Sequence, residues 1–257
     1  STKIQSIYNP DVTYVTTDEP AESVGRIMQK YDLVAIPVVD SIGRLVGRIT
    51  IDDVVDVIRE EAEKDYQMMS GISQDVESSD TIWDQTKARL PWLIIGLFGG
   101  MLAAYMISFY EADIALFPAT AMFIPVITAM GGNVGIQSSA IVVKGLASNT
   151  LTSKNILQSI SKEISCAVIN ACICSSIIFI LSLCFNLTSL AMPITVTISL
   201  FIVIMFASMF GTAFPLLLNK LKIDPALATG PFITLTNDII GLNIYLFTGK
   251  AILGWLL

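Results

Sequence analysis

Long apolar runs, separated by short polar connections, fill the chain from residue 91 to its end. The hydrocarbon core of a bilayer is about 30 Å thick, so a helix that spans it needs about 20 mostly apolar residues. The runs are long enough for five such helices, and a polar break at 186–193 divides the longest run. The expected spans are 91–110, 114–143, 164–185, 194–219 and 226–247.

The first 64 residues instead alternate short β-type segments with amphipathic ones. The pattern predicts strands over 12–16, 35–40 and 45–50, a helix over 20–31, and a further helix that begins at Ile51. Val24, Ile27 and Met28 share one face of the first helix, which we expect to be buried. This part of the chain is therefore expected to be a small α/β domain.

Together the two patterns predict a mainly α membrane protein, with five transmembrane helices preceded by a small α/β domain. The expected parts are 1–64 for the α/β domain, 65–90 for a connecting helix and interfacial linker, and 91–257 for the transmembrane domain. Trp83 and Trp92 bracket the entry to the first span, where interfacial aromatic residues are common. The chain begins at Ser1 without a methionine, so we expect further residues upstream.

Charge separates the same two parts. The net charge is -7 and 14% of residues are charged, against about 25% in ordinary soluble domains. The first 90 residues hold 9 basic and 17 acidic residues, whereas the remainder holds 6 and 5. The lack of a basic patch excludes nucleic-acid binding, and the apolar part excludes a single soluble globule. There is no histidine, and the four cysteines lie in one apolar run, so we expect no disulfide framework.

Basic residues next to the predicted spans indicate the orientation, because such residues concentrate on the cytoplasmic side. They flank the first span and the connections after the second and fourth spans: Lys87, Arg89, Lys144, Lys154, Lys162, Lys220 and Lys222. The α/β domain is therefore expected in the cytoplasm and the carboxyl terminus on the opposite side. Lys250 is the one basic residue that this orientation places on the opposite side.

Asp238 is the acidic side chain that the predicted spans place inside the membrane. An aspartate at mid-membrane costs about 2.5–3.5 kcal/mol on insertion scales, so it is not expected to face lipid. Thr234 and Gly241 share its helical face, where Gly241 would let a backbone or a hydrated ion come close. Pro231 would leave the carbonyl of Leu227 without its helical donor. The alternative is a protonated, hydrogen-bonded Asp238 with a structural role.

The second predicted span adds further polar oxygens. Gly131 and Gly132 loosen the helix, and Asn133, Gln137 and Ser138 follow on one side. A tight helix–helix contact explains the glycines alone but explains the amide side chains less well. A lining of neutral oxygens with one carboxylate suits Mg²⁺, which dehydrates reluctantly and keeps several waters. The absence of cysteine and histidine from this set argues against zinc or copper.

An acidic stripe follows the last predicted strand. Asp52, Asp56, Glu60 and Glu63 lie on one helical face, where like charges at i,i+4 repel. A divalent cation that bridges the stripe to another acidic surface would relieve this repulsion. The alternative is a solvated helix face. Just before the stripe, Thr50 and Asp53 have the spacing of a helix cap.

The stretch YDLVAIPVVDSIGRLVGRITIDDVVDVI, residues 31–58, resembles a cystathionine-β-synthase (CBS) domain. Such domains work in pairs, so this resemblance implies either an upstream partner or pairing between two chains. In the CBS domains that bind adenine nucleotides, a Thr or Ser and an acidic residue three positions later contact phosphate and ribose. Thr50 and Asp53 match these positions, which makes ATP a candidate ligand alongside the capping interpretation.

The stretches GGNVGIQSSAIVVKGLA (131–147) and DPALATGPFITLTNDIIGLNIYLF (224–247) resemble the MgtE family of magnesium channels. The resemblance covers the CBS region and the membrane part. It implies a homodimer whose pore, on the two-fold axis, is lined by the second and fifth spans. Asp238 would then bind hydrated Mg²⁺, with Gly241 and the backbone around Thr234 beside it. Two further residues match the family: Asn133 in its pore motif and Asp224 at the cytoplasmic mouth. Ile136 departs from the pattern, because the family usually has a second Asn there.

The resemblance also implies that cytoplasmic Mg²⁺ closes the pore by binding between CBS domains, connecting helices and membrane domain. The residues that resemble this sensor are Asp52, Asp53, Asp56, Glu60, Glu61, Glu63 and Asp65. The family's N-terminal helical domain and first CBS domain do not occur in this sequence. The expected partners are a second copy of the chain, membrane lipid and a divalent cation.

Three other functions are alternatives to a magnesium channel. In a proton- or sodium-coupled divalent-cation transporter, Asp238 would carry the proton. In a nucleotide-sensing CBS protein, the membrane part would be an anchor, which needs no polar interior. Enzyme activity is not expected, because the sequence shows no nucleophile–base pair and no phosphate-cradling glycine loop.

Overall fold

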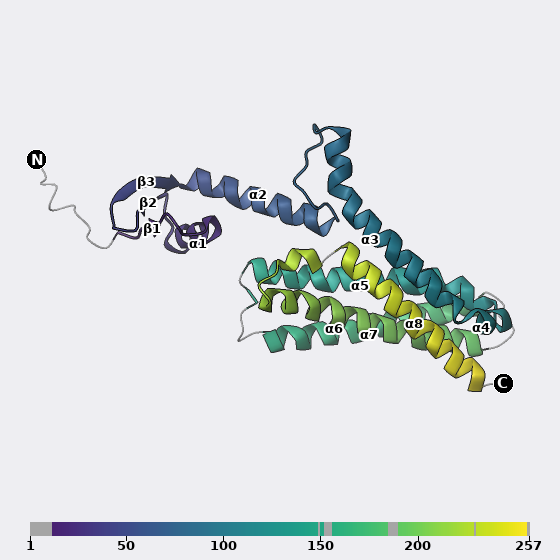
Figure 1. The fold of residues 1–257 in the computed structure, drawn as a ribbon. Coiled ribbons are helices and arrows are strands. Elements are labelled where there is room, and N and C mark those ends of the chain that lie inside the picture. The colour runs from purple at the N-terminus through teal and green to yellow at the C-terminus, as the bar shows by residue number, and fades with distance from the viewer. Residues whose placement is uncertain (1–11, 149, 152–155, 185–189, 229, 256–257) are drawn as a thin grey trace, which may run out of the picture. The chain divides into compact units, whose positions relative to one another are not determined.

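The computed structural model describes residues 12–148, 150–151, 156–184, 190–228 and 230–255. The chain divides into two compact units, Ser1–Tyr66 and Gln67–Leu257. The elements follow one another as Figure 1 labels them, with three strands near the N-terminus and long helices in the second unit. The fold is thus mainly helical with a small α/β part, as predicted.

The first unit is a three-stranded sheet with one helix between its first two strands. β1 (Val15–Thr16) pairs in parallel with β2 (Ala35–Val39), and β2 pairs antiparallel with β3 (Leu45–Thr50). The parallel pair needs a crossover, which α1 (Ala21–Tyr31) supplies. The core of the unit consists of Val15, Val24, Met28, Ile36 and Val54, with Ile27 packed against it. The predicted inward face of the first helix is therefore confirmed.

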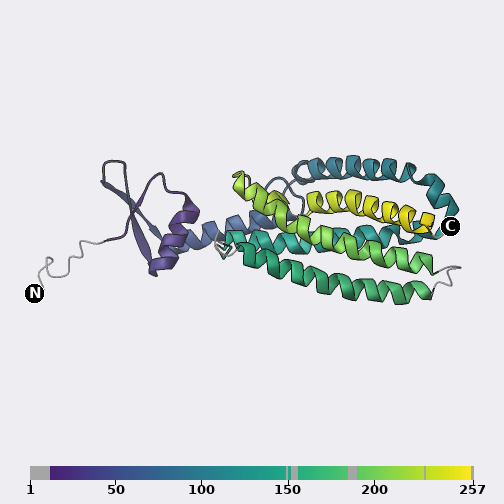
Figure 2. The same cartoon turned by 90° about the horizontal axis from the view of Figure 1, so that it is seen from below.

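The second unit is a bundle of long helices that follow the end of α2 (Ile51–Met69). Its elements are α3 (Ile82–Ser108), α4 (Glu111–Leu116), α5 (Ala119–Ala147), α6 (Ile156–Leu183), α7 (Ala191–Lys220), the 3-10 turn η2 (Pro225–Ala228) and α8 (Pro231–Trp255). The long helices run side by side (Figure 2), and the closest packing joins α5, α6, α7 and α8.

Among the described residues, four helices are long and apolar enough to cross a membrane: α3, α5, α6 and α7. The fifth predicted span, 226–247, falls largely on α8. That helix packs along α5 and α7, but its sequence includes the polar residues Asn237, Asp238 and Asn243. Its role as a fifth span remains a prediction.

Three helix boundaries differ from the predicted ones. The span predicted over 114–143 is divided between α4 and α5 at Phe117 and Pro118. The span predicted to start at 164 lies in α6, which already begins at Ile156, so Glu163 is inside a helix. The break predicted at 186–193 lies partly outside the described residues. Helix α7 begins at Ala191.

The start of α8 corrects the interpretation of Pro231. This proline is the first residue of α8, where its missing N–H would have no helical partner anyway. The preceding Pro225–Ala228 segment forms η2 rather than part of the same helix. Pro231 therefore starts the helix and does not interrupt it. Asp238 lies about two turns from this start.

Glycines let the central helices approach each other at backbone distance. A Cβ added to Gly211 of α7 would lie 2.4 Å from the carbonyl oxygen of Gly135 in α5. A Cβ added to Gly135 would lie 1.9 Å from the side-chain nitrogen of Asn237 in α8. Three helices therefore meet at one point, which fixes how α8 lies against α5.

Two polar contacts connect the C-terminal half of α8 to the region of α4 and α5. The hydroxyl of the fully buried Tyr245 donates to the carbonyl oxygen of Thr120 at 2.9 Å. The ammonium group of Lys250 lies 3.2 Å from the carboxylate of Asp113. This ion pair accounts for the one basic residue that the predicted orientation places outside.

Candidate functional site

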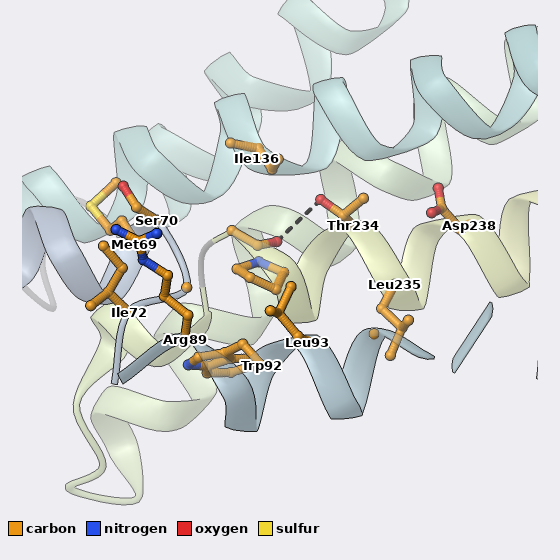
Figure 3. A pocket seen from close by; sticks show the side chains of 14 residues that line it. Met69, Ser70, Ile72, Arg89, Trp92, Leu93, Ile136, Thr234, Leu235 and Asp238 are labelled. Atoms are coloured by element: carbon orange, nitrogen blue, oxygen red, sulfur yellow. Dashed lines mark hydrogen bonds between the residues drawn. The ribbon is translucent and has the colours of Figure 1, made fainter. Parts of the chain in front are cut away.

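Helices α5 and α8 bring the predicted pore residues together. A Cβ added to Gly132 of α5 would lie 3.2 Å from Thr234 Cγ2 and 3.7 Å from Asp238 Oδ1. Because Gly132 has no side chain, the side chain of Asp238 lies close to the backbone of α5. Thr234, Asp238 and Ile136 line one cavity of about 760 Å³, which Figure 3 shows from close by.

The other walls of this cavity come from α3 and from the segment after α2. Arg89, Trp92, Leu93 and Gly96 of α3 line it, together with residues 69–72. Arg89 places a positive charge in the same cavity as Asp238. In the sequence, Arg89 indicates only the orientation of the chain. Its role in the cavity could not be predicted, because it depends on how α3 packs against α8.

The 69–72 segment fits against the start of α8 through two glycines. Gly71 and Gly230 have positive φ angles of 78° and 61°, which glycine adopts without strain. A Cβ on Gly71 would lie 2.6 Å from Pro231 Cγ, and one on Gly230 would lie 2.1 Å from the carbonyl oxygen of Met69. The hydroxyl of Thr234 donates to the carbonyl oxygen of Gly230 at 3.2 Å (Figure 3).

The remaining predicted site residues lie apart from this cavity. Gly241 packs against α7, where an added Cβ would be 3.2 Å from Val203 Cγ1. Helix packing therefore explains this glycine without an ion. The carboxylate of the exposed Asp224 accepts the backbone N–H of Ala226 at 2.9 Å and thereby begins η2. The structure thus brings Asp238 and Thr234 together and places Gly241 and Asp224 elsewhere.

Polar side chains lie uncovered at the middle of α5. Asn133 is near the midpoint of Ala119–Ala147, and Gln137 follows one turn later. Both are exposed, next to residues that border the cavity. Amide groups that face hydrocarbon without partners cost several kcal/mol each. This face of α5 therefore requires either water or a second protein surface.

At the start of α2, Thr50 and Asp53 form a helix cap. The carboxylate oxygen Oδ2 of Asp53 accepts the backbone N–H of Thr50 at 3.0 Å and its hydroxyl at 2.7 Å. The hydroxyl contact is the largest of the causes that lower the pKa of Asp53 below its usual value, followed by the backbone contact. The geometry fits the capping interpretation. Nucleotide binding at these residues remains a prediction.

The Asp53 cap predicts a pH-dependent contribution to stability. Because the pKa of Asp53 is lower in the folded state, its carboxylate stabilises the fold above the unfolded pKa and ceases to do so as pH falls through the folded pKa. We expect Asp53→Asn to lower amide protection of β3 and the start of α2 at neutral pH. Hydrogen exchange, corrected for the intrinsic rate at each pH, checks this. If Asp53→Asn lowered amide protection by the same amount at acidic and at neutral pH, the prediction would be contradicted.

The acidic stripe of α2 lies on an exposed helix. Arg59 pairs with Glu63 at 2.9 Å, and both side chains are largely solvent-exposed. Within the part of the chain that the structure describes, no three Asp, Glu, His or Cys residues gather around a common point. A cation at this stripe would therefore need ligands from another surface. Its regulatory role remains a prediction.

Glu163 is a further acidic residue inside the bundle. It accepts hydrogen bonds from Ser138 of α5 and Ser208 of α7. The predicted third span started at Ile164, which left Glu163 in a connection. The amphipathic start of α6 was the signal that could have placed it inside.

Comparison with known proteins shows two matches along the chain. Residues 124–248 match the MgtE family, described as divalent cation transporter, and residues 4–60 match the CBS domain. The chain is 36% identical to the magnesium transporter MgtE of Bacillus subtilis over 95% of its own length and 54% of that protein. It is 32% identical to the magnesium transporter MgtE of Thermus thermophilus over 98% of its length and 56% of that protein.

The matches therefore place a CBS domain ahead of a region that matches a divalent cation transporter family, and that region lies among the long apolar helices. The chain belongs to the MgtE family of divalent cation transporters. It spans about half the length of the curated relatives it matches. Those relatives are named as transporters and not as enzymes.

Proposed function

We propose that the chain is one subunit of a homodimeric magnesium channel. The carrying observation is the uncovered polar face of α5, with Asn133 and Gln137, beside the cavity that contains Asp238. A second copy that faces this surface would enclose the amides and both carboxylates around one water-filled path. The relatives' name, magnesium transporter, supports Mg²⁺ as the ion.

In this proposal the channel binds Mg²⁺ with its water shell. Mg²⁺ dehydrates reluctantly, so a site with few carboxylates and many retained waters suits it. Asp238 would attract the ion by charge, and Thr234, whose hydroxyl lies on the same cavity, would accept hydrogen bonds from the bound waters. Asn133 would continue the polar lining along α5, while Asp224 would attract cations at the cytoplasmic mouth. Gly241 supports the site only indirectly, through the packing of α8 on α7.

Transport experiments in vesicles test the proposal. Purified chain reconstituted into lipid vesicles is expected to take up Mg²⁺ down its gradient, at the same rate with and without a pH or sodium gradient. Uptake that requires one of these gradients would instead favour the coupled transporter. Parallel measurements with Ca²⁺ and Mn²⁺ define the selectivity. No uptake by correctly folded chain would contradict the proposal.

We also propose that cytoplasmic Mg²⁺ closes the pore through the CBS domain. The CBS match and the contact between the 69–72 segment and the start of α8 support this, because that segment follows α2 directly. The regulatory ligands would come from Asp52, Asp53, Asp56, Glu60, Glu61, Glu63 and Asp65. ATP at Thr50 and Asp53 would be a second input to the same domain.

Neutralising the acidic stripe tests the gating proposal. The triple change Asp52→Asn, Asp56→Asn and Glu60→Gln is expected to raise the Mg²⁺ concentration that half-closes the pore several-fold, because fewer carboxylates bind the closing ions. Flux measured against Mg²⁺ on the side of the CBS domain checks this. Replacing Glu22 and Glu77, which lie off the stripe, by glutamine provides the control. Closure at the parent concentration would show that the stripe is only a solvated face.

A further inference from the structure

The carboxylate of Glu163 lies where α5, α6 and α7 meet. Its oxygen Oε1 accepts the hydroxyl of Ser138 at 2.6 Å and that of Ser208 at 3.0 Å. The two serines are 3% and 1% exposed and come from α5 and α7, while Glu163 itself belongs to α6. The acidic group is therefore built into the bundle by donors from both neighbouring helices.

The charge of this carboxylate has no protein counter-ion among the described residues. The ion pairs found there are Arg26–Glu22, Arg59–Glu63 and Lys250–Asp113. Charges inside proteins are paired with another charge or bind a metal ion, because an isolated charge is costly in a medium of low dielectric. No described residue supplies the compensating charge, so a cation bound from solution is the candidate partner.

Two cavities border Glu163 and provide space for a counter-ion. The larger has a volume of about 260 Å³ and includes Thr150, Ser159 and Thr212 in its lining. The smaller, of about 110 Å³, is lined by Ser208 and Thr212. A single water needs only about 10–15 Å³ of cavity volume, so the larger cavity has room for an ion together with several waters.

This region is separate from the cavity of Asp238. No lining residue is shared between that cavity and the two at Glu163. On α5, Ile136 lines the Asp238 cavity, whereas the buried Ser138 contacts Glu163. The walls of the larger cavity come from the end of α5, the start of α6 and the last turns of α7. The two sites therefore lie on different sides of α5.

We propose that Glu163 binds a hydrated divalent cation in the larger cavity, at a second site in each subunit. Oxygen Oε2 faces the ion directly or through water, while Oε1 stays bound to Ser138 and Ser208. The hydroxyls of Ser159 and Thr212 bind waters of its shell. The ion neutralises the carboxylate and thereby stabilises the packing of α6 on α5 and α7. This site does not depend on the pore function of Asp238.

Counting bound Mn²⁺ tests the site in the complete chain. In lipid nanodiscs with excess K⁺, Glu163→Gln is expected to bind one Mn²⁺ fewer per subunit than the parent. The double variant Ser138→Ala/Ser208→Ala keeps the carboxylate and is expected to retain that ion, although it removes both hydroxyl donors to Oε1. An unchanged count in Glu163→Gln, or no such ion in the parent at excess K⁺, would overturn the proposal.

A second measurement leaves Glu163 and its partners intact. One variant carries a nitroxide on Cys166, three residues after Glu163 in α6. The other carries it on Cys184, directly after the last residue of α6. In both variants the remaining cysteines are replaced by alanine and Asp238 by asparagine. Both cysteines are exposed. Bound Mn²⁺ is expected to broaden the nitroxide signal at Cys166 more strongly. Equal broadening at both positions would place no ion at Glu163 and would overturn the proposal.

Discussion

Replacing Asp238 by asparagine is expected to reduce Mg²⁺ flux more than about tenfold, which corresponds to at least about 1.4 kcal/mol of lost stabilisation of the ion. Asparagine has nearly the same shape, so the approach of α8 to Gly132 of α5 is kept. The change removes the carboxylate charge from a cavity that also contains the positive Arg89. Without that charge the repulsion from Arg89 is no longer offset. Vesicle flux measurements check the result.

Asp224→Asn is the matched control for this change. Asp224 is exposed at η2 and lines none of the cavities described here. Its neutralisation removes the same charge from the chain and is expected to lower flux by a smaller factor. Flux in Asp238→Asn within twofold of the parent, at equal protein in the vesicles, would show that this carboxylate does not serve the ion path.

Replacing Gly211 by valine is expected to destabilise the bundle by about 1–3 kcal/mol or more, because an overpacked helix contact forces backbone shifts. Even the first added carbon would lie 2.4 Å from the carbonyl oxygen of Gly135. That oxygen belongs to a helix backbone and cannot move independently of α5. The expected result is a lower thermal unfolding midpoint in detergent, together with reduced flux.

Gly100→Val provides the control, since an added Cβ at Gly100 of α3 would meet no atom within 4 Å. The same side chain is introduced into another long apolar helix, but without a clash. We expect its unfolding midpoint to stay close to that of the parent. Equal losses for Gly211→Val and Gly100→Val would show that the α5–α7 glycine contact is not what limits stability.

The sequence predicted those parts of the fold that local patterns determine. The three strands and α1 follow from alternating and amphipathic residues, and four of the long helices follow from length and hydropathy. The division between α4 and α5 was not predicted, since apolar composition continues through Phe117 and Pro118. The start of α8 was placed too early because Pro225–Ala228 has the composition of a helix but forms a separate turn.

The candidate site was predictable only in part. Asp238 was found because a carboxylate in an apolar helix is unusual, and Thr234 because it lies one turn away on the same helix. The positions of Gly241, Arg89 and Glu163 depend on which helices pack together. Helical spacing alone cannot supply that information, because every face of a buried apolar helix looks similar in sequence.

The central claim is that the face shared by α5 and α8 lines a water-filled ion path. A cysteine at Ile136, which lines the Asp238 cavity, tests it in a chain whose native cysteines are replaced by alanine. A positively charged, membrane-impermeant thiol reagent is expected to react there and block Mg²⁺ flux, while Mg²⁺ slows the reaction. A cysteine at Ile177 of α6, a 52% exposed residue on another helix, is the control and should leave flux unchanged. Complete modification at 136 with undiminished flux would contradict the account.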